Sequence, residues 1–370
     1  MSSHFTRREF IGGSLGTAAL GLAAPQWAIA RNPTPKILVV IELAGGNDGL
    51  NTVVPFKDEA YYRARPHIAI PTQKLLPITE EFALHPALRE LAELYQEGHL
   101  AIINGVGYED SSRSHFEAMD VWHSGEVNAG EQPQSGWLGR YLIIIGDDIG
   151  VVIGNRLPLA LASSNQLVSL LPASQSNESL PILQALYQNH SFVEPAEFIF
   201  ADVQAPHVAP YPQTELAQNL QTIARLIADD SKARVFYVRL SGFDTHQNQT
   251  AAHANILSTL SGALAAFQQD LKEQGKGKDV LTLTVSEFGR SVPENSMGGT
   301  DHGAANCLFA IGEGVRGGVY GSYPALNDLD NGALKPTVDF RQVYATILEK
   351  WLGADSEKVL NGCFKILDFV

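Results

Sequence analysis

Short apolar runs alternate with longer amphipathic segments along this chain, and this alternation is the feature that most restricts its fold. Residues 36–43 (KILVVIEL) have the composition of a buried strand, residues 85–98 place apolar side chains at helical spacing, and residues 100–107 (LAIINGVG) form a second buried run. A strand, a helix and a strand in this order are typical of a parallel sheet covered by helices. The sequence therefore predicts an α/β fold with a mostly parallel central sheet.

The same alternation continues in the C-terminal half of the chain. Strands are predicted over 233–240 and 279–285, and helices over 215–230, 256–275 and 339–353. Polar loops follow the predicted strands. Because ligands of open α/β sheets bind outside the carboxyl ends of the strands, we expect these loops to meet at one site.

The region from about 126 to 212 departs from this pattern. It is rich in Pro, Ser and Gln and has weak periodicity. We interpret it as an insertion or cap on a single domain that spans residues 31–370.

Residues 1–30 have the pattern of a twin-arginine export signal. Arg7 and Arg8 precede an apolar run, and the small residues at 28–30 (AIA) offer a cleavage site. The apolar run is Gly-rich and shorter than the roughly 20 residues that span a bilayer. The sequence therefore predicts recognition by the twin-arginine export machinery, no stable membrane span after processing, and a periplasmic or secreted protein.

The formal net charge of −14 restricts the partners of the protein. An acidic surface repels phosphate backbones and anionic lipid, so the composition argues against nucleic-acid binding. A small anionic ester could bind if a local cation attracted it, and a divalent metal ion such as Zn, Ca, Mg or Mn would provide one. The two cysteines, Cys307 and Cys363, allow one disulfide or two free thiols.

Carboxylates and imidazoles in the polar loops are the candidate metal ligands. They are Asp48, Asp244, His246, Glu287, Asp301 and His302. Side chains at i and i+2 of an extended segment point the same way, so Asp244 and His246 could reach one ion. Three of these residues also have another possible role. Asp48 could form an Asx-turn, and Glu287 could form a salt bridge with Arg290. Asp301 could make a local hydrogen bond to His302 within a turn, or it could orient His302 as a ligand.

Catalytic candidates stand near the start of a predicted helix over SHFEAMDVWHSG. Ser114, next to His115, could be a helix N-cap or a nucleophile activated by a metal, and Ser111 and Ser112 compete for either role. Arg113 or Arg290 could hold an anionic group with a bidentate clamp.

Several ordered motifs resemble the bacterial exported family called domain of unknown function 1501. They include RREFIGG, ELAGGNDGLNTVVP, RSHFEAMDVWHSG, GFDTHQNQ, SEFGRSVPEN followed by GTDHG, and DFRQVYATILEKWLG. This family is in turn similar to the alkaline phosphatase and sulfatase superfamily. The resemblance implies a three-layer α/β/α sandwich, alkaline phosphatase-like, with metals at the strand ends.

The superfamily resemblance also implies roles for individual residues. Asp48 would match the metal Asp after the first strand and Ser114 the nucleophile, and the later candidates would match the remaining ligands. The chain departs from the phosphatases where Glu287 and Phe288 replace an Asp-His pair, and it lacks the motif that sulfatases convert to formylglycine. The resulting hypothesis is an exported metal-dependent hydrolase of phosphate or sulfate esters, and the alternative is a non-catalytic binding or assembly protein with the same fold.

Overall fold

The computed structural model describes residues 35–127, 133–146, 149–164, 168–171, 210–229 and 231–370. The chain divides into two units, Met1–Thr34 and Pro35–Val370, and all described residues belong to the second. The predicted export signal therefore lies outside the described residues. No described helix is both long and apolar enough to cross a bilayer.

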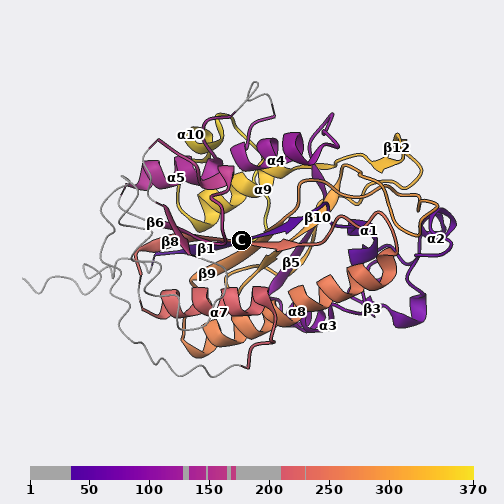
Figure 1. Ribbon diagram of the computed structural model, residues 1–370, viewed down its shortest axis with the longest axis horizontal. Helices are drawn as coiled ribbons and strands as arrows, with labels where there is room; N and C mark the ends of the chain where they lie inside the picture. The colour runs from indigo at the N-terminus through magenta and orange to yellow at the C-terminus, as the bar shows by residue number, and fades with distance from the viewer. Residues whose placement is uncertain (1–34, 128–132, 147–148, 165–167, 172–209, 230) are drawn as a thin grey trace, which may run out of the picture. The chain divides into compact units, whose positions relative to one another are not determined.

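A nine-stranded mixed sheet forms the centre of the described part of this unit (Figure 1). From one edge to the other, the strands are β11 (Gly318–Tyr320), β5 (Leu100–Gly107), β10 (Asn306–Ile311), β9 (Val280–Val285), β1 (Ile37–Ala44), β8 (Ala233–Ser241), β6 (Ile149–Ile153) and β7 (Val168–Leu171), with β14 (Val338–Asp339) paired to β5. β10 is antiparallel to β5 and β9, and the other pairs are parallel. The mostly parallel sheet predicted from the sequence is confirmed.

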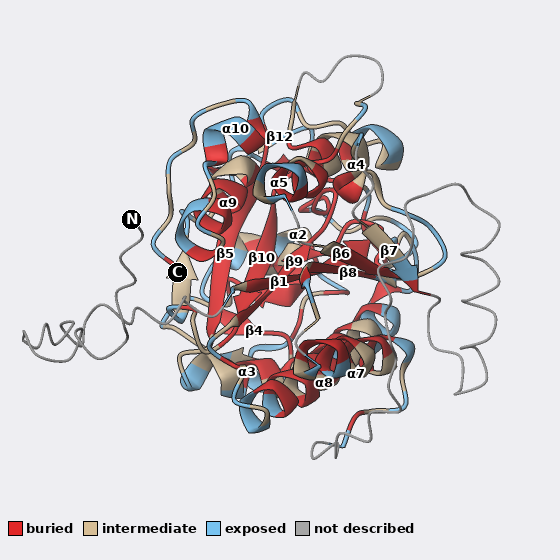
Figure 2. Ribbon diagram, turned by 90° about the vertical axis from the view of Figure 1, so that its left-hand side faces the viewer, coloured by how far each residue is buried: buried red, intermediate tan, exposed pale blue. Residues whose placement is uncertain are grey.

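Helices cover both faces of the sheet and complete a three-layer α/β/α sandwich, as Figure 2 shows. One face carries α4 (His115–Ser124), α5 (Trp137–Ile145) and α9 (Phe340–Thr346), and the other carries α3 (Arg89–Gln96), α7 (Glu215–Ala228) and α8 (Gln249–Glu273). Side chains alternate along a strand. Val39 and Ile41 of β1 therefore pack in the core beneath α3, α7 and α8, whereas Leu38 and Val40 pack in the core beneath α4, α5 and α9.

Short elements occupy the connections. They are α1 (Gly49–Thr52), α2 (Glu59–Ala64), α10 (Ser356–Leu360), the 3₁₀ turns Thr72–Lys74 and Leu159–Leu161, a small sheet of β2 (Val53–Val54), β4 (Ala83–Leu84) and β3 (Leu76–Pro77), and the pair β12 (Leu329–Asp330) and β13 (Ala333–Leu334).

The predicted strands and helices are present, with differences in their bounds: the helix predicted over 85–98, for example, spans Arg89–Gln96. The helix predicted from residue 256 begins earlier, at Gln249. The helix predicted over 339–353 is divided into α9 and a π-helical turn, Ile347–Trp351. The sequence analysis did not predict β10, whose five apolar residues, 307–311, follow a polar loop, and it did not predict β6, β7, β11 or α5.

Part of the region interpreted as an insertion or cap contributes to the central sheet. β6 pairs with β8, and β7 forms the outer edge beyond it. Helix α5 packs its apolar face in the same core as α4 and α9. Residues 172–209 of this region lie outside the described part of the chain.

The two cysteines are free thiols. Cys307 is buried in β10, and Cys363 is exposed near the C-terminus. Of the two alternatives that the sequence left open, the structure therefore has the unpaired one.

Candidate metal centre

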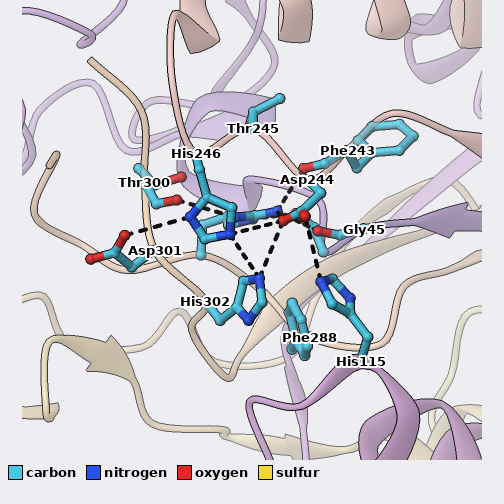
Figure 3. Close-up of polar contacts among 12 residues, drawn as sticks. Gly45, His115, Phe243, Asp244, Thr245, His246, Phe288, Thr300, Asp301 and His302 are labelled. Atoms are coloured by element: carbon cyan, nitrogen blue, oxygen red, sulfur yellow. Dashed lines mark hydrogen bonds and ion pairs between the residues drawn. The ribbon is translucent and has the colours of Figure 1, made fainter. Parts of the chain in front are cut away.

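Three side chains from distant parts of the sequence meet where strands β8 and β9 end. One ligand atom each from His115, Asp244 and His302 lies within 4.8 Å of the other two (Figure 3). Asp244 follows β8, His115 is the first residue of α4, and His302 lies in the loop before β10. The convergence expected at the carboxyl ends of the strands is therefore present for these residues.

The distances among the ligand atoms are short. Nε2 of His302 lies 3.2 Å from Oδ1 of Asp244, and Nε2 of His115 lies 3.6 Å from Oδ2 of the same carboxylate. His246 joins from the opposite side, with its Nε2 at 3.0 Å from both Oδ1 of Asp244 and Nε2 of His302. Ligands about 2.0–2.1 Å from a tetrahedral zinc ion lie about 3.3 Å apart, so these separations suit one small cation.

Hydrogen bonds to the outer ring nitrogens fix how two of the imidazoles face the cluster. Nδ1 of His302 donates to the backbone carbonyl of Arg113 at 2.8 Å, because a carbonyl can only accept. Nδ1 of His115 lies 2.9 Å from Oε1 of Glu287 and donates to this carboxylate. In their neutral form both rings therefore present an unprotonated Nε2 to Asp244, which is the arrangement that second-shell acceptors give to metal-binding histidines.

Glu287 acts on the cluster through His115. Its side chain is only 3% exposed, and Oε1 also accepts a hydrogen bond from the backbone N–H of Gly45 at 2.8 Å. The sequence predicts Glu287 as a direct metal ligand. The structure instead places it behind the imidazole, where it orients the ring.

Phe288 forms an apolar support under two of the imidazoles. It is buried, and its ring centroid lies 5.0 Å from that of His115 and 4.5 Å from that of His302. The loop after β1 passes close to it, because a Cβ on Gly46 would come within 2.4 Å of the Phe288 ring. A glycine is also required there because its φ of +79° is unfavourable for other residues.

Arg290 is fully engaged inside the protein. Its buried guanidinium pairs with Oδ1 of Asp244 at 2.6 Å and donates to the backbone carbonyls of Gly45, Gly46, Phe243 and Thr300. Burial by itself would raise the pKa of Asp244, but the hydrogen bond and the positive charge of Arg290 hold it below its usual value. Arg290 is thus a structural partner of Asp244, whereas the sequence suggested that it could hold an anionic group of the substrate.

Asp48 lies outside the cluster. Its buried carboxylate accepts from Arg65 at 2.7 Å and from Gln249 at 2.5 Å, and it caps α1 by accepting from the N–H of Asn51 at 3.4 Å. Burial would raise the pKa of Asp48, but Arg65 and the other partners lower it. The sequence predicts Asp48 as a metal ligand, and the structure gives it a buried ion pair and a helix cap in place of that role.

Asp301 lies at the edge of the site. Its side chain is largely exposed, Oδ1 is 3.6 Å from Nδ1 of His246, and Asn295 donates to the same oxygen at 3.1 Å. Asp301 is therefore placed beside His246, whereas His302 is oriented by Arg113. A hydrogen bond between Asp301 and His302, the structural alternative considered from the sequence, is absent from the contacts of the described residues.

The side chains of Ser114 and Ser112 differ in their hydrogen bonds. Ser114 precedes α4 as its N-cap residue, yet its side chain makes no capping hydrogen bond. Ser112 is engaged, since it donates to Glu117 at 2.5 Å and accepts from the N–H of Ser114. The side chain of Arg113 points to the β12–β13 turn and donates to the carbonyls of Asp330 and Asn331.

The sequence analysis did not identify a second polar group, which is centred on Glu42. Glu42, on β1, accepts from Tyr237 at 2.5 Å, from His123 at 3.2 Å and from Arg239 at 3.0 Å. Burial would raise the pKa of Glu42, but the bond from His123 and its other partners lower it. The signal in the sequence was a lone glutamate inside a buried strand, KILVVIEL.

Comparison with known proteins agrees with the resemblance seen in the motifs. The model of the family described as "Protein of unknown function (DUF1501)" matches residues 195–364. No protein with a curated description matches the chain.

Solved structures of the alkaline phosphatase superfamily and of sulfatases are similar to this chain at low identity. A protein in the alkaline phosphatase superfamily from Vibrio parahaemolyticus is 10% identical, with a TM-score of 0.46 and coverage of 88% of this chain and 69% of that one. The PsFucS1 sulfatase from Pseudoalteromonas sp. is 14% identical, with a TM-score of 0.44 and coverage of 90% and 71%. The C-terminal periplasmic domain of EcEptC from Escherichia coli, in complex with Zn, is 11% identical, with a TM-score of 0.42 and coverage of 76% and 74%.

Proposed function

We propose that this protein is an exported, metal-dependent hydrolase of phosphate or sulfate esters. The observation that carries the proposal is the orientation of His115 and His302: each ring donates from Nδ1 to a protein acceptor and turns Nε2 towards the carboxylate of Asp244. In the neutral rings, the electron pairs on these three groups repel one another unless a cation or a proton lies between them. The donor set therefore fits a bound metal ion.

The charges around the cluster support the same proposal. Three carboxylates lie in it or next to it, those of Asp244, Glu287 and Asp301, against the one guanidinium of Arg290. A divalent cation would balance this excess of negative charge. Imidazole nitrogens with one carboxylate suit zinc better than calcium or magnesium, which prefer oxygen ligands.

The site is open on one side to a substrate. The side chain of Asp244 is 48% exposed and that of His115 is 35% exposed, so solvent reaches the ligands. A metal ion bound there would offset charge on an ester oxygen and lower the pKa of a nearby hydroxyl or water. Ser114 adjoins His115 at the start of α4, where backbone N–H groups and the helix dipole favour an anionic group.

Metal binding is tested on protein freed of metal by a chelator and dialysed. We expect one equivalent of zinc per chain by elemental analysis and by titration, and loss of that equivalent in His115→Ala and His302→Ala. His99→Ala is the matched control, because this half-buried histidine lies beside Glu97 and outside the site. A wild type that binds no stoichiometric metal would overturn the metal centre.

Catalysis is tested with chromogenic phosphate and sulfate esters on the zinc-loaded protein. We expect turnover in the wild type, and a loss of at least a hundredfold in kcat in Ser114→Ala with zinc stoichiometry unchanged. Retained kcat in Ser114→Ala would assign the attack to a bound water. No turnover of any ester by the metal-loaded wild type would reject the hydrolase.

Rejection of the hydrolase would favour a non-catalytic binding or assembly protein. One observation supports this second candidate: Arg113 and Arg290, which the sequence suggested as holders of an anionic group, are both occupied by protein acceptors. Stoichiometric metal without turnover is the result that separates the two candidates.

We further propose that residues 1–30 direct export by the twin-arginine machinery. Replacing both Arg7 and Arg8 with lysine should keep the chain in the cytoplasmic fraction of a Gram-negative host. Export of the double variant at the wild-type level would contradict this proposal.

A further inference from the structure

Gln249 connects the buried Asp48 to two of the three segments that carry the candidate ligands, the loop of Asp244 and the loop of His302. It is the first residue of α8, and its side chain is fully buried. Its Nε2 donates to Asp48 at 2.5 Å, and its Oε1 accepts from the hydroxyls of Thr245 at 3.1 Å and Thr300 at 2.7 Å. The side-chain amide of Gln249 thus makes hydrogen bonds to three different segments of the chain.

The two threonines are next to the ligands in the chain. Thr245 stands between Asp244 and His246, and Thr300 stands two residues before His302. The N–H of Thr300 also donates to the carbonyl of Thr245 at 3.3 Å. By holding both hydroxyls, Gln249 sets the spacing between the loop after β8 and the loop before β10.

Asp48 provides a rigid anchor for this amide. Arg65 holds its carboxylate and also donates to the carbonyls of Ser291 and Val292, in the segment that leads to Thr300. The anchor and the loop are therefore tied to the same buried guanidinium. A side chain that touches no ligand can in this way control where the ligands lie.

We propose that Gln249 is a positioning residue for the metal centre, and that through it Asp48 acts on the cation indirectly. This inference rests on the proposed function. These contacts require a glutamine at position 249. A glutamate would place a second negative charge against Asp48. A methionine of similar size would leave the carboxylate and both threonine hydroxyls without this partner.

The test compares Gln249→Met and Gln249→Glu with a control on the same helix, Gln268→Met. Gln268 is also buried in α8, and its Nε2 has no hydrogen-bond partner among the described residues, so its loss removes no connection to the site. Zinc affinity is measured by competition with a chromophoric chelator. We expect about 10- to 100-fold weaker binding in both Gln249 variants, as for other outer-shell partners of metal ligands, and less than threefold change in the control.

Two further measurements separate positioning from a general loss of stability. The visible spectrum of the cobalt-substituted protein should change in Gln249→Met and stay unchanged in Gln268→Met, because the spectrum reports ligand geometry. In metal-free protein, amide hydrogen exchange should rise in peptides covering 243–247 and 297–302 in the Gln249 variants only.

The outcomes distinguish the two proposals. A wild type that binds no zinc overturns the metal centre, and faster exchange confined to the two loops would still support Gln249 as the residue that positions them. Wild-type zinc affinity, cobalt spectrum and exchange in Gln249→Met would overturn the inference while leaving the metal centre in place.

Discussion

Replacing Arg65 with methionine should lower the free energy of unfolding by about 3–5 kcal/mol, the usual effect of removing one partner from a buried ion pair. The guanidinium is fully buried, pairs with Asp48 and donates to Asn51, Ser291 and Val292. Methionine fills much of the space but leaves the carboxylate buried without its charge partner.

The part of this loss that comes from the unpaired charge cannot exceed the free energy needed to protonate Asp48. A carboxyl with an ordinary pKa near 3.9 can be kept neutral at pH 7 at a cost of about 4 kcal/mol, since each pH unit is worth about 1.4 kcal/mol. In the wild type, Arg65 lowers the pKa of Asp48, so stability is lost as the pH falls through it. Without Arg65, burial raises this pKa and the folded state takes up a proton more readily than the unfolded chain. The deficit of Arg65→Met should therefore shrink as the pH falls from 7 to 5.

Urea denaturation followed by circular dichroism at pH 7 and pH 5 measures both effects, as a shift of the midpoint at unchanged slope. The matched control is Arg63→Met in α2, two residues before Arg65, whose exposed pair with Glu59 should contribute less than about 1 kcal/mol. In the double variant with Asp48→Asn, the loss should be smaller than the sum of the two single losses, because the uncompensated charge is gone. A loss below about 1 kcal/mol in Arg65→Met, or a deficit that does not change with pH, would refute the reasoning.

Three other substitutions test the surroundings of the site. Glu287→Gln should weaken zinc binding about 10- to 100-fold, since it loses the charged acceptor behind an imidazole, and an unchanged affinity in the chelator competition would remove this orienting role. Gly46→Ala should destabilise the fold by about 2 kcal/mol or more, because its Cβ would overlap the ring of Phe288 at a positive φ; a wild-type urea midpoint would contradict this. Burial lowers the pKa of His85 and of His253 to about 4 in the folded protein. Between about pH 6.5 and pH 4 these histidines therefore bind protons in the unfolded chain but not in the folded protein, so stability should fall as the pH is lowered through this range. His253→Asn should flatten that fall in stability, and an unchanged pH profile of the urea midpoint would show that this histidine does not cause it.

Local periodicity was enough to predict much of the fold. Strand β1 was predicted within one residue at each end and β5 over the same residues, because a run of apolar side chains is a property of neighbouring residues. β10 was missed because its apolar run has only five residues, 307–311, directly after a polar loop.

The ligand loops were also predictable to a useful degree. Asp244, His246 and His302 were selected because metal-binding residue types follow strands or stand in a Gly-rich loop, and the structure brings the three together. These choices needed only residue type and position at the end of an element.

The sequence by itself determined the strands and helices that have long apolar or amphipathic runs, and the residue types placed after those strands, because both depend on neighbouring positions. Only the tertiary structure decided that His115 faces the cluster while Asp48 turns away from it. Glu287 orients His115 from 172 positions away along the chain, and Gln249 binds Asp48 across 201 positions. The direction of a side chain depends on such long-range hydrogen bonds and on which buried charges need partners, and neither can be read from its immediate neighbours.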